Sequence, residues 1–172
     1  METSTTTQTE PMKQAEPQEE HQWLQKLVGE WSLEAEMTMA PGEPPKKTTG
    51  TESVRSVGGL WVVAEGQGEM PDGGAGTSIM TLGYDPQKKQ YVGTWIGSMM
   101  THLWIYEGSL DAGERVLTLN SEGPSMSGDG TLAKYQDVIE LKSDDHRILT
   151  SRMPGEDGKW QVFMTAHYRR KK

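Results

Sequence analysis

Apolar and polar residues alternate along most of this chain, which is the pattern of a β-strand with one buried face. The clearest example runs from Trp31 to Met39, where apolar side chains occupy every second position. Further extended stretches of about ten residues follow, separated by short turns rich in Gly, Pro and Asp. The predicted strands are 31–39, 48–57, 60–69, 77–84, 91–96, 102–106, 116–122, 132–141, 148–153 and 160–170.

The connections between these strands are too short to hold crossover helices, so adjacent strands are expected to be antiparallel and to run up and down. About ten such strands in an open sheet would expose long edges, which closure into a barrel removes. We therefore predict an all-β, closed up-and-down antiparallel β-barrel. A barrel of more than about eight strands is wider than its own side chains fill, which predicts a ligand cavity. A two-sheet sandwich is the alternative, although it usually needs longer crossing connections.

The N-terminal part of the chain differs from the strands. Residues 1–20 hold Thr, Gln, Glu and Pro and almost nothing apolar, so burial cannot offset the entropy of ordering them, and we expect a disordered acidic tail. Residues 21–28 place apolar side chains at helical spacing before Gly29, which predicts a short helix. Because so short a helix is unstable alone, we expect it to plug one end of a barrel domain formed by residues 21–172.

Composition excludes several classes of function. The net charge is −8, and apart from the four basic residues at the C-terminus there is no basic patch, so neither nucleic acid nor an anionic membrane surface is an expected partner. No run approaches the roughly 18 apolar residues of a membrane-spanning helix, and the N-terminus lacks an apolar signal segment. The absence of cysteine excludes disulfides and thiolate metal sites. These features predict a cytoplasmic protein.

One stretch of the chain is predicted to carry a carboxylate into the barrel. Tyr135 and Asp137 lie in phase with Ile139 on an alternating strand. A carboxylate that faces an interior must be paired, hydrated or protonated, so we expect Asp137 to pair with Arg152 or Arg170. Three roles remain open for it: a structural ion pair at the barrel end, a polar group that orients a ligand, or a catalytic acid.

Methionine and tryptophan dominate the large apolar side chains, with 11 Met and 6 Trp against a single Phe. Such side chains form a soft, adaptable wall for a small molecule, although their ordinary role is core packing. Met99 and Met100 lie at a turn, where one of the two is expected to form a mobile lip at the barrel mouth. The predicted ligand-lining residues, besides Tyr135, Asp137 and Arg152, are Met37, Met39, Met80, Met99, Met100, Met164, Trp95 and Trp104.

Several motifs resemble those of known families. Gly29 and Trp31 resemble the G-x-W opening of lipocalins and related calycins, in which the tryptophan packs against a basic residue of the last strand at the closed barrel end. Arg169 or Arg170 matches that residue here, and the phase favours Arg170. More closely, residues 21–170 resemble the bacterial domain-of-unknown-function family 1579, which implies a calycin-like barrel and no particular activity. The motifs are WLxxLVGEW (23–31), GYDP (83–86), YVGTWIGSM (91–99), WIYEG (104–108), SEGP (121–124), YxDVIE (135–140), DGKW (157–160) and YRR (168–170).

Cofactors and metals are not expected. The four histidines lack metal-ligand spacing. The nitrobindins, which are similar barrels, bind haem through a histidine on a late strand, and His167 lies on the last strand here. It is out of phase with the apolar row, however, so haem is disfavoured. That row, predicted to face inward, is Trp160, Val162, Met164, Ala166 and Tyr168.

The predicted function is non-covalent binding of a small, largely apolar molecule inside the barrel. An enzyme is the first alternative, with Asp137 or Glu122 as an acid or base in the same cavity. A structural module is the second, such as a homodimer through the barrel wall with a filled interior. That module would bury outward-facing aromatic residues such as Trp61.

Overall fold

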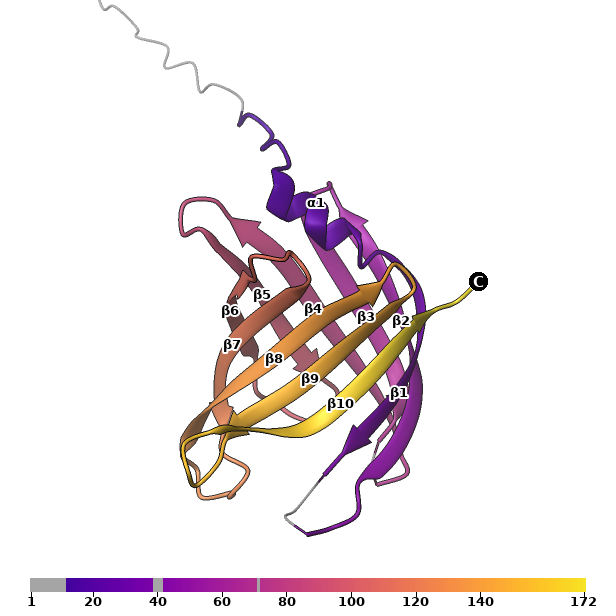
Figure 1. The fold of residues 1–172 in the computed structure, drawn as a ribbon, viewed down its shortest axis with the longest axis vertical. Coiled ribbons are helices and arrows are strands. Elements are labelled where there is room, and N and C mark those ends of the chain that lie inside the picture. Colours follow the sequence, from indigo (N-terminus) through magenta and orange to yellow (C-terminus); the bar gives the residue numbers. More distant parts are fainter. Residues whose placement is uncertain (1–11, 39–41, 71) are drawn as a thin grey trace, which may run out of the picture.

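The computed structural model describes residues 12–38, 42–70 and 72–172, which form a closed β-barrel with a short helix at one end (Figure 1). The elements in chain order are α1 (Glu19–Gln25), β1 (Gly29–Met37), β2 (Lys46–Val57), β3 (Trp61–Glu69), β4 (Ala75–Asp85), β5 (Gln90–Gly97), β6 (Trp104–Leu110), β7 (Val116–Pro124), β8 (Leu132–Ser143), β9 (His146–Pro154) and β10 (Trp160–Arg170).

Each strand pairs antiparallel with the next along the chain, and β1 pairs with β10 to close the ring. This order confirms the predicted up-and-down barrel and rules out the two-sheet sandwich. In Figure 1, α1 lies over one end of the barrel, and β1, β3, β5, β7 and β9 end at the opposite end, which we call the mouth. Within the described ranges, no helix combines the length and the apolar character that crossing a membrane requires.

The helix differs in its bounds from the prediction. It begins two residues earlier and ends three residues earlier than the expected segment 21–28. Its first two residues therefore belong to the segment expected to be disordered, of which residues 1–11 lie outside the described residues. It ends early because the N–H groups of Lys26, Leu27 and Val28 bond to carbonyls three residues back, which tightens the final turn. Met39, the expected end of the first strand, also lies outside the described residues.

The helix is held on the barrel by apolar packing and by hydrogen bonds to the end of β4 and to the turn after β6. The indole Nε1 of Trp23 donates to the carbonyl of Glu114 at 2.7 Å. The ring of His21 is 4% exposed, and its Nε2 donates to the carbonyl of Tyr84 at 3.1 Å. A helix this short is unstable alone, so its contacts with the barrel stabilise it. The docked helix plugs this end of the barrel. The buried side chains of this segment are His21, Trp23, Leu24 and Leu27.

Arg170, at the end of β10, joins the helix to the first strand. Its Nη1 donates to the carbonyl of Val28 at 2.7 Å and its Nη2 to that of Lys26 at 3.1 Å, so it satisfies carbonyls that the end of a helix leaves free. Its guanidinium lies 4.3 Å from the centre of the Trp31 ring. Gly29 has φ +141°, and a Cβ there would overlap Arg170 Nη1. Both facts explain the glycine of the G-x-W motif.

One strand breaks the expected alternation. β10 pairs regularly with β9 as far as Val162, and the register shifts before pairing resumes at Met164. This bulge inserts one extra residue, so the alternation changes face. The prediction that Trp160 and Val162 point inward is therefore wrong, because they are 39% and 55% exposed. Phe163 turns inward instead, with its ring centre 6.2 Å from that of Tyr135.

Candidate functional site

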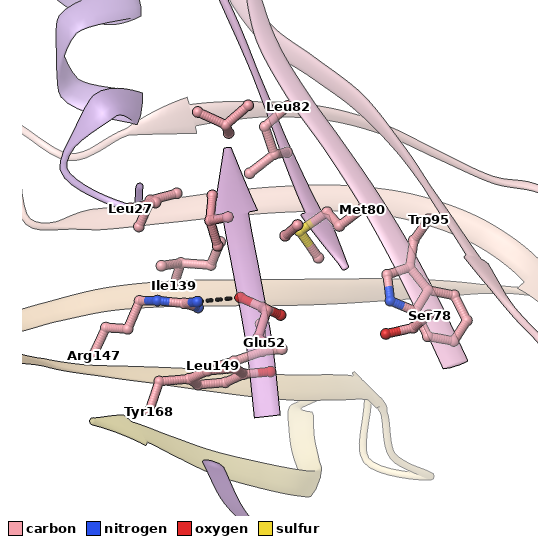
Figure 2. A pocket seen from close by; sticks show the side chains of 13 residues that line it. Leu27, Glu52, Ser78, Met80, Leu82, Trp95, Ile139, Arg147, Leu149 and Tyr168 are labelled. Carbon is pink, nitrogen blue, oxygen red and sulfur yellow. Dashed lines mark hydrogen bonds and ion pairs between the residues drawn. The ribbon is translucent and has the colours of Figure 1, made fainter. Parts of the chain in front are cut away.

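A cavity lies inside the barrel, between the helix end and the mouth (Figure 2). The space open to the centre of a water-sized sphere is about 40 Å³, which is room for about three water molecules. Most of the wall is apolar, and the lining residues with charged or hydroxyl groups are Glu52, Ser78, Arg147 and Tyr168. The residues that line it are Leu27, Glu52, Val54, Val62, Ala64, Ser78, Met80, Leu82, Trp95, Ile139, Arg147, Leu149 and Tyr168.

A buried ion pair forms one side of this cavity. Nη2 of Arg147, on β9, donates to Oε1 of Glu52, on β2, and Figure 2 shows the two side chains meeting across the interior. Their side chains are only 4% and 12% exposed. The guanidinium lies between two rings, 4.7 Å from the centre of Trp31 and 4.0 Å from that of Tyr168. Stacking and the carboxylate together offset part of the cost of burying the cation.

The charge of Arg147 is therefore matched, but its hydrogen-bonding capacity is not exhausted. Its Nε is buried and has no hydrogen-bond partner among the residues that the structure describes. Burial raises the pKa of the Tyr168 hydroxyl, and the charge of Glu52 raises it further. Tyr168 thus stays a neutral phenol beside the ion pair.

Asp137 faces inward as predicted from its phase, but its partners are not arginines. Oδ1 accepts a hydrogen bond from Ser151 Oγ at 2.6 Å, and Oδ2 accepts one from the hydroxyl of Tyr106. Burial raises the pKa of Asp137, whereas the two donated hydrogen bonds act in the opposite direction. Asp137 is not among the residues that line the cavity.

Arg152 lies on the outer face of the barrel, which corrects its predicted place inside. Its Nε donates to Gln136 Oε1 at 2.8 Å, and its guanidinium lies 5.6 Å from the centre of the Trp160 ring. The register explains this outcome, since Arg152 is opposite Gln136 while Ser151 is opposite Asp137. Side chains of neighbouring residues on a strand point to opposite faces, so an arginine one position later cannot reach Asp137.

Aromatic side chains fill the barrel toward the mouth. Trp95 and Trp104 are directly opposite each other on β5 and β6. The ring of Trp104 packs against Gly123, where any Cβ would overlap it, and meets the ring of Tyr135 edge to face at 5.1 Å. The hydroxyl of Tyr135 donates to the carbonyl of Pro124 at 2.6 Å. These contacts link Trp104, Tyr135 and Phe163 into one aromatic cluster.

The predicted methionines and Trp95 lie in different parts of the barrel. Met80 and Trp95 line the cavity. Met37 and Met164 are opposite each other on β1 and β10, and Met164 packs against the core. Met99 and Met100 are 43% and 44% exposed in the turn after β5, at the mouth, and Trp104 Nε1 donates to Met100 Sδ at 3.1 Å. Met39 lies outside the described residues.

Sequence reasoning missed the ion pair. A signal was present, because Arg147 alternates in phase with Leu149 and Glu52 with Val54, all inward positions of β9 and β2. The signal is weak, because a charged residue near the end of a strand, or between Thr51 and Ser53, is usually solvated. Their pairing joins residues 95 positions apart, which only the closed ring brings together.

Two alternative sites lie on the outside of the barrel. His167 Nδ1 and His146 Nε2 are 3.0 Å apart, and the rings stack on the outer face, which supports the expectation that His167 does not point inward. Glu122 is exposed on β7, beside the inward Gly123, so its predicted place in the cavity is wrong. The described residues include no cluster of three or more His, Asp or Glu side chains suited to a metal ion.

These features define a class of protein: a ten-stranded antiparallel barrel, plugged by a helix and closed by a tryptophan–arginine pair. Residues 16–170 match the family model described as "Protein of unknown function (DUF1579)", and the chain belongs to that family, as its motifs predicted. No curated protein matches the chain.

Solved structures resemble the chain in fold. The crystal structure of Rv2717c from M. tuberculosis has a TM-score of 0.60 at 14% identity, covering 91% of this chain and 100% of that one. A redesigned β-barrel, mFAP0, bound to DFHBI, has a TM-score of 0.47 at 15% identity, covering 85% and 100%. At such identities the likeness to Rv2717c shows the fold alone, and the weaker likeness to the redesigned barrel carries no argument about ligands.

Proposed function

We propose that this protein binds a small molecule non-covalently inside its barrel. The observation that carries the proposal is the pair of Glu52 and Arg147, buried in the wall of an otherwise mainly apolar cavity. A buried ion pair adds little stability over apolar residues of similar volume, because desolvation opposes the attraction. An apolar pocket with a few well-placed polar groups is, in contrast, the usual form of a small-molecule site.

The size of the cavity limits the ligand. A space of about 40 Å³ admits a compact molecule of a few heavy atoms, and anything larger requires side chains to move. Entry through the mouth would displace Trp104 and the half-exposed Met99 and Met100. Methionine side chains reorient at low cost, which supports this end as the entrance.

Native mass spectrometry of the full chain, purified from cells without denaturation, tests the proposal. We expect a co-purifying mass in the wild type that is absent from the double variant Glu52→Gln/Arg147→Met, which removes both charges together. Arg152→Met, on the outer face, is the matched control and should retain the mass. A wild type that carries no adduct, and that no compound of a small-fragment library stabilises, would refute the proposal.

A structural or dimer-forming barrel is the second candidate, favoured by apolar side chains exposed on the outer wall. Ile96 and Ile105, which lie on neighbouring strands, are 46% and 60% exposed, and Trp61 is 42% exposed near α1. Sedimentation equilibrium separates the candidates. A monomer at micromolar concentration excludes the dimer, whereas a dimer broken by Ile105→Glu supports it.

A further inference from the structure

We infer that the interior ligand is uncharged and that its hydrogen-bonding end sits in a recess between Glu52 and Ser78. This inference rests on the proposed function and names the chemical class of the ligand. The class is a small molecule with an apolar body and one neutral polar group, such as an alcohol or a primary amide.

A glycine in the barrel wall creates the recess. In the register of the sheet, Glu52 on β2 is opposite Gly66 on β3, and Gly66 is opposite Ser78 on β4. A Cβ on Gly66 would lie 2.8 Å from Ser78 Oγ and 3.9 Å from Glu52 Oε2. The carboxylate and the hydroxyl therefore flank a position that lacks a side chain, and both line the cavity.

The polar atoms at the recess suit a ligand that donates and accepts hydrogen bonds. Arg147 occupies Oε1 of Glu52, which leaves Oε2 facing the Gly66 gap as an acceptor. The Ser78 hydroxyl can donate or accept. A hydroxyl or carboxamide placed between them would donate to Glu52 and accept from Ser78. Both its hydrogen-bond donor and its acceptor would then have a partner.

Charge complementarity excludes charged ligands. The positive charge of Arg147 is already matched by Glu52 and enclosed by the rings of Trp31 and Tyr168. A ligand carboxylate would leave a surplus negative charge in the interior, and an ammonium would compete with Arg147 for Glu52. Either outcome leaves one buried charge uncompensated, which low-dielectric surroundings strongly penalise.

The remaining wall is suited to an apolar body. Met80 lies between Ser78 and Leu82 along β4, Trp95 is opposite Met80 on β5, and Leu82 and Leu27 close the cavity toward α1 (Figure 2). Arg147 Nε and the Tyr168 hydroxyl are further polar groups of lining residues, but the recess is where a carboxylate oxygen and a hydroxyl flank a gap, so we place the polar end of the ligand there. This asymmetry fixes the orientation of the ligand, with the polar end at Gly66.

A series of four-carbon probes in two size-matched pairs tests the inference at neutral pH: butan-1-ol with butylamine, and butanamide with butyrate. The full-length protein is titrated with each probe, and the Met80 methyl and Trp95 indole N–H signals are followed by NMR. We expect saturable shifts with the alcohol and the amide, and binding at least about tenfold weaker for the two charged probes.

Two variants locate the polar end. Ser78→Ala removes the hydroxyl and should weaken butanamide by about threefold to tenfold. Gly66→Ala places a methyl in the recess and should weaken both neutral probes at least as much, and its extended backbone accepts alanine. Ser109→Ala, at an exposed position of β6, is the matched control and should bind like the wild type. Should Gly66→Ala fail to fold, Ser78→Ala alone decides this point.

The failure of this inference differs from the failure of the proposed function. Butyrate binding more tightly than butanamide, with affinity lost in Arg147→Met, would overturn the uncharged class while interior binding stands. Equal butanamide affinity in Ser78→Ala and the wild type would overturn the recess. If no probe shifts the Met80 or Trp95 signals, the inference is also overturned. If, in addition, the wild type carries no co-purifying mass and no compound of the fragment library stabilises it, the proposed function is refuted too.

Discussion

The ion pair between Glu52 and Arg147 gives the sharpest prediction about stability. Its side chains are 12% and 4% exposed, so it belongs to buried pairs and not to surface pairs. Removal of one partner from a buried pair costs about 3–5 kcal/mol, because the other charge is left uncompensated. Arg147→Met should therefore lower the free energy of unfolding by that amount. For a chain of this length, the melting temperature should fall by roughly 6–20 °C.

The double variant Glu52→Gln/Arg147→Met separates the pair energy from the loss of packing. Because it leaves no lone charge, it should be more stable than Arg147→Met alone, and the double-mutant cycle should give a coupling energy of at least about 2 kcal/mol. Arg147→Lys should lie in between, since lysine keeps the charge but cannot stack flat between Trp31 and Tyr168.

Urea unfolding followed by tryptophan fluorescence measures these free energies, and the slope m should stay the same across the variants. Arg152→Met, whose partner is an outer-face amide, should lose no more than about 1 kcal/mol. A loss below about 1 kcal/mol in Arg147→Met, or additive effects in the cycle, would refute the view that the pair is buried and coupled.

Three further predictions follow from local geometry. Gly29→Ala should cost about 1–3 kcal/mol in urea unfolding, because φ is +141° and the methyl would overlap the Arg170 guanidinium; an unchanged midpoint contradicts this. Phe163→Ala should destabilise by about 1–3 kcal/mol and Val162→Ala by less than about 0.5 kcal/mol, since the bulge points only Phe163 inward; the reverse order would show regular alternation. Burial and neighbouring positive charges lower the pKa of His146 from 6.5, so the unfolded state binds the proton more strongly. Its contribution to stability is present above about pH 6.5 and lost as pH falls below that value. The stability of His146→Gln should accordingly vary less between about pH 7.5 and 5.5 than that of the wild type, and parallel curves would exclude this role.

The errors in the predicted site share one cause. Alternate residues of a strand face inward and outward, and the residues concerned were assigned to the wrong face. The alternation placed Asp137 and Tyr135 on the inward face, as the structure has them. The prediction that Arg152 points inward is wrong because the register places it opposite Gln136, whose side chain is on the outer face. A single bulge then reversed the facing of Trp160 and Val162. One inserted residue changes no composition and hardly changes the local pattern, yet it exchanges the two faces of the strand.

The alternation of apolar residues, the short turns and the family motifs were enough to predict the fold: ten antiparallel strands, their order and their closure. These are local or nearest-neighbour properties, because each strand pairs with the next one along the chain. Which side chains meet inside the barrel depends, in contrast, on contacts between strands that are distant in sequence. Glu52 and Arg147 are far apart in sequence and adjacent only after β1 meets β10, and the recess at Gly66 exists only when three strands lie in register. Pairing across a closed cylinder depends on the shear and facing of every intervening strand, and no window of sequence contains that information.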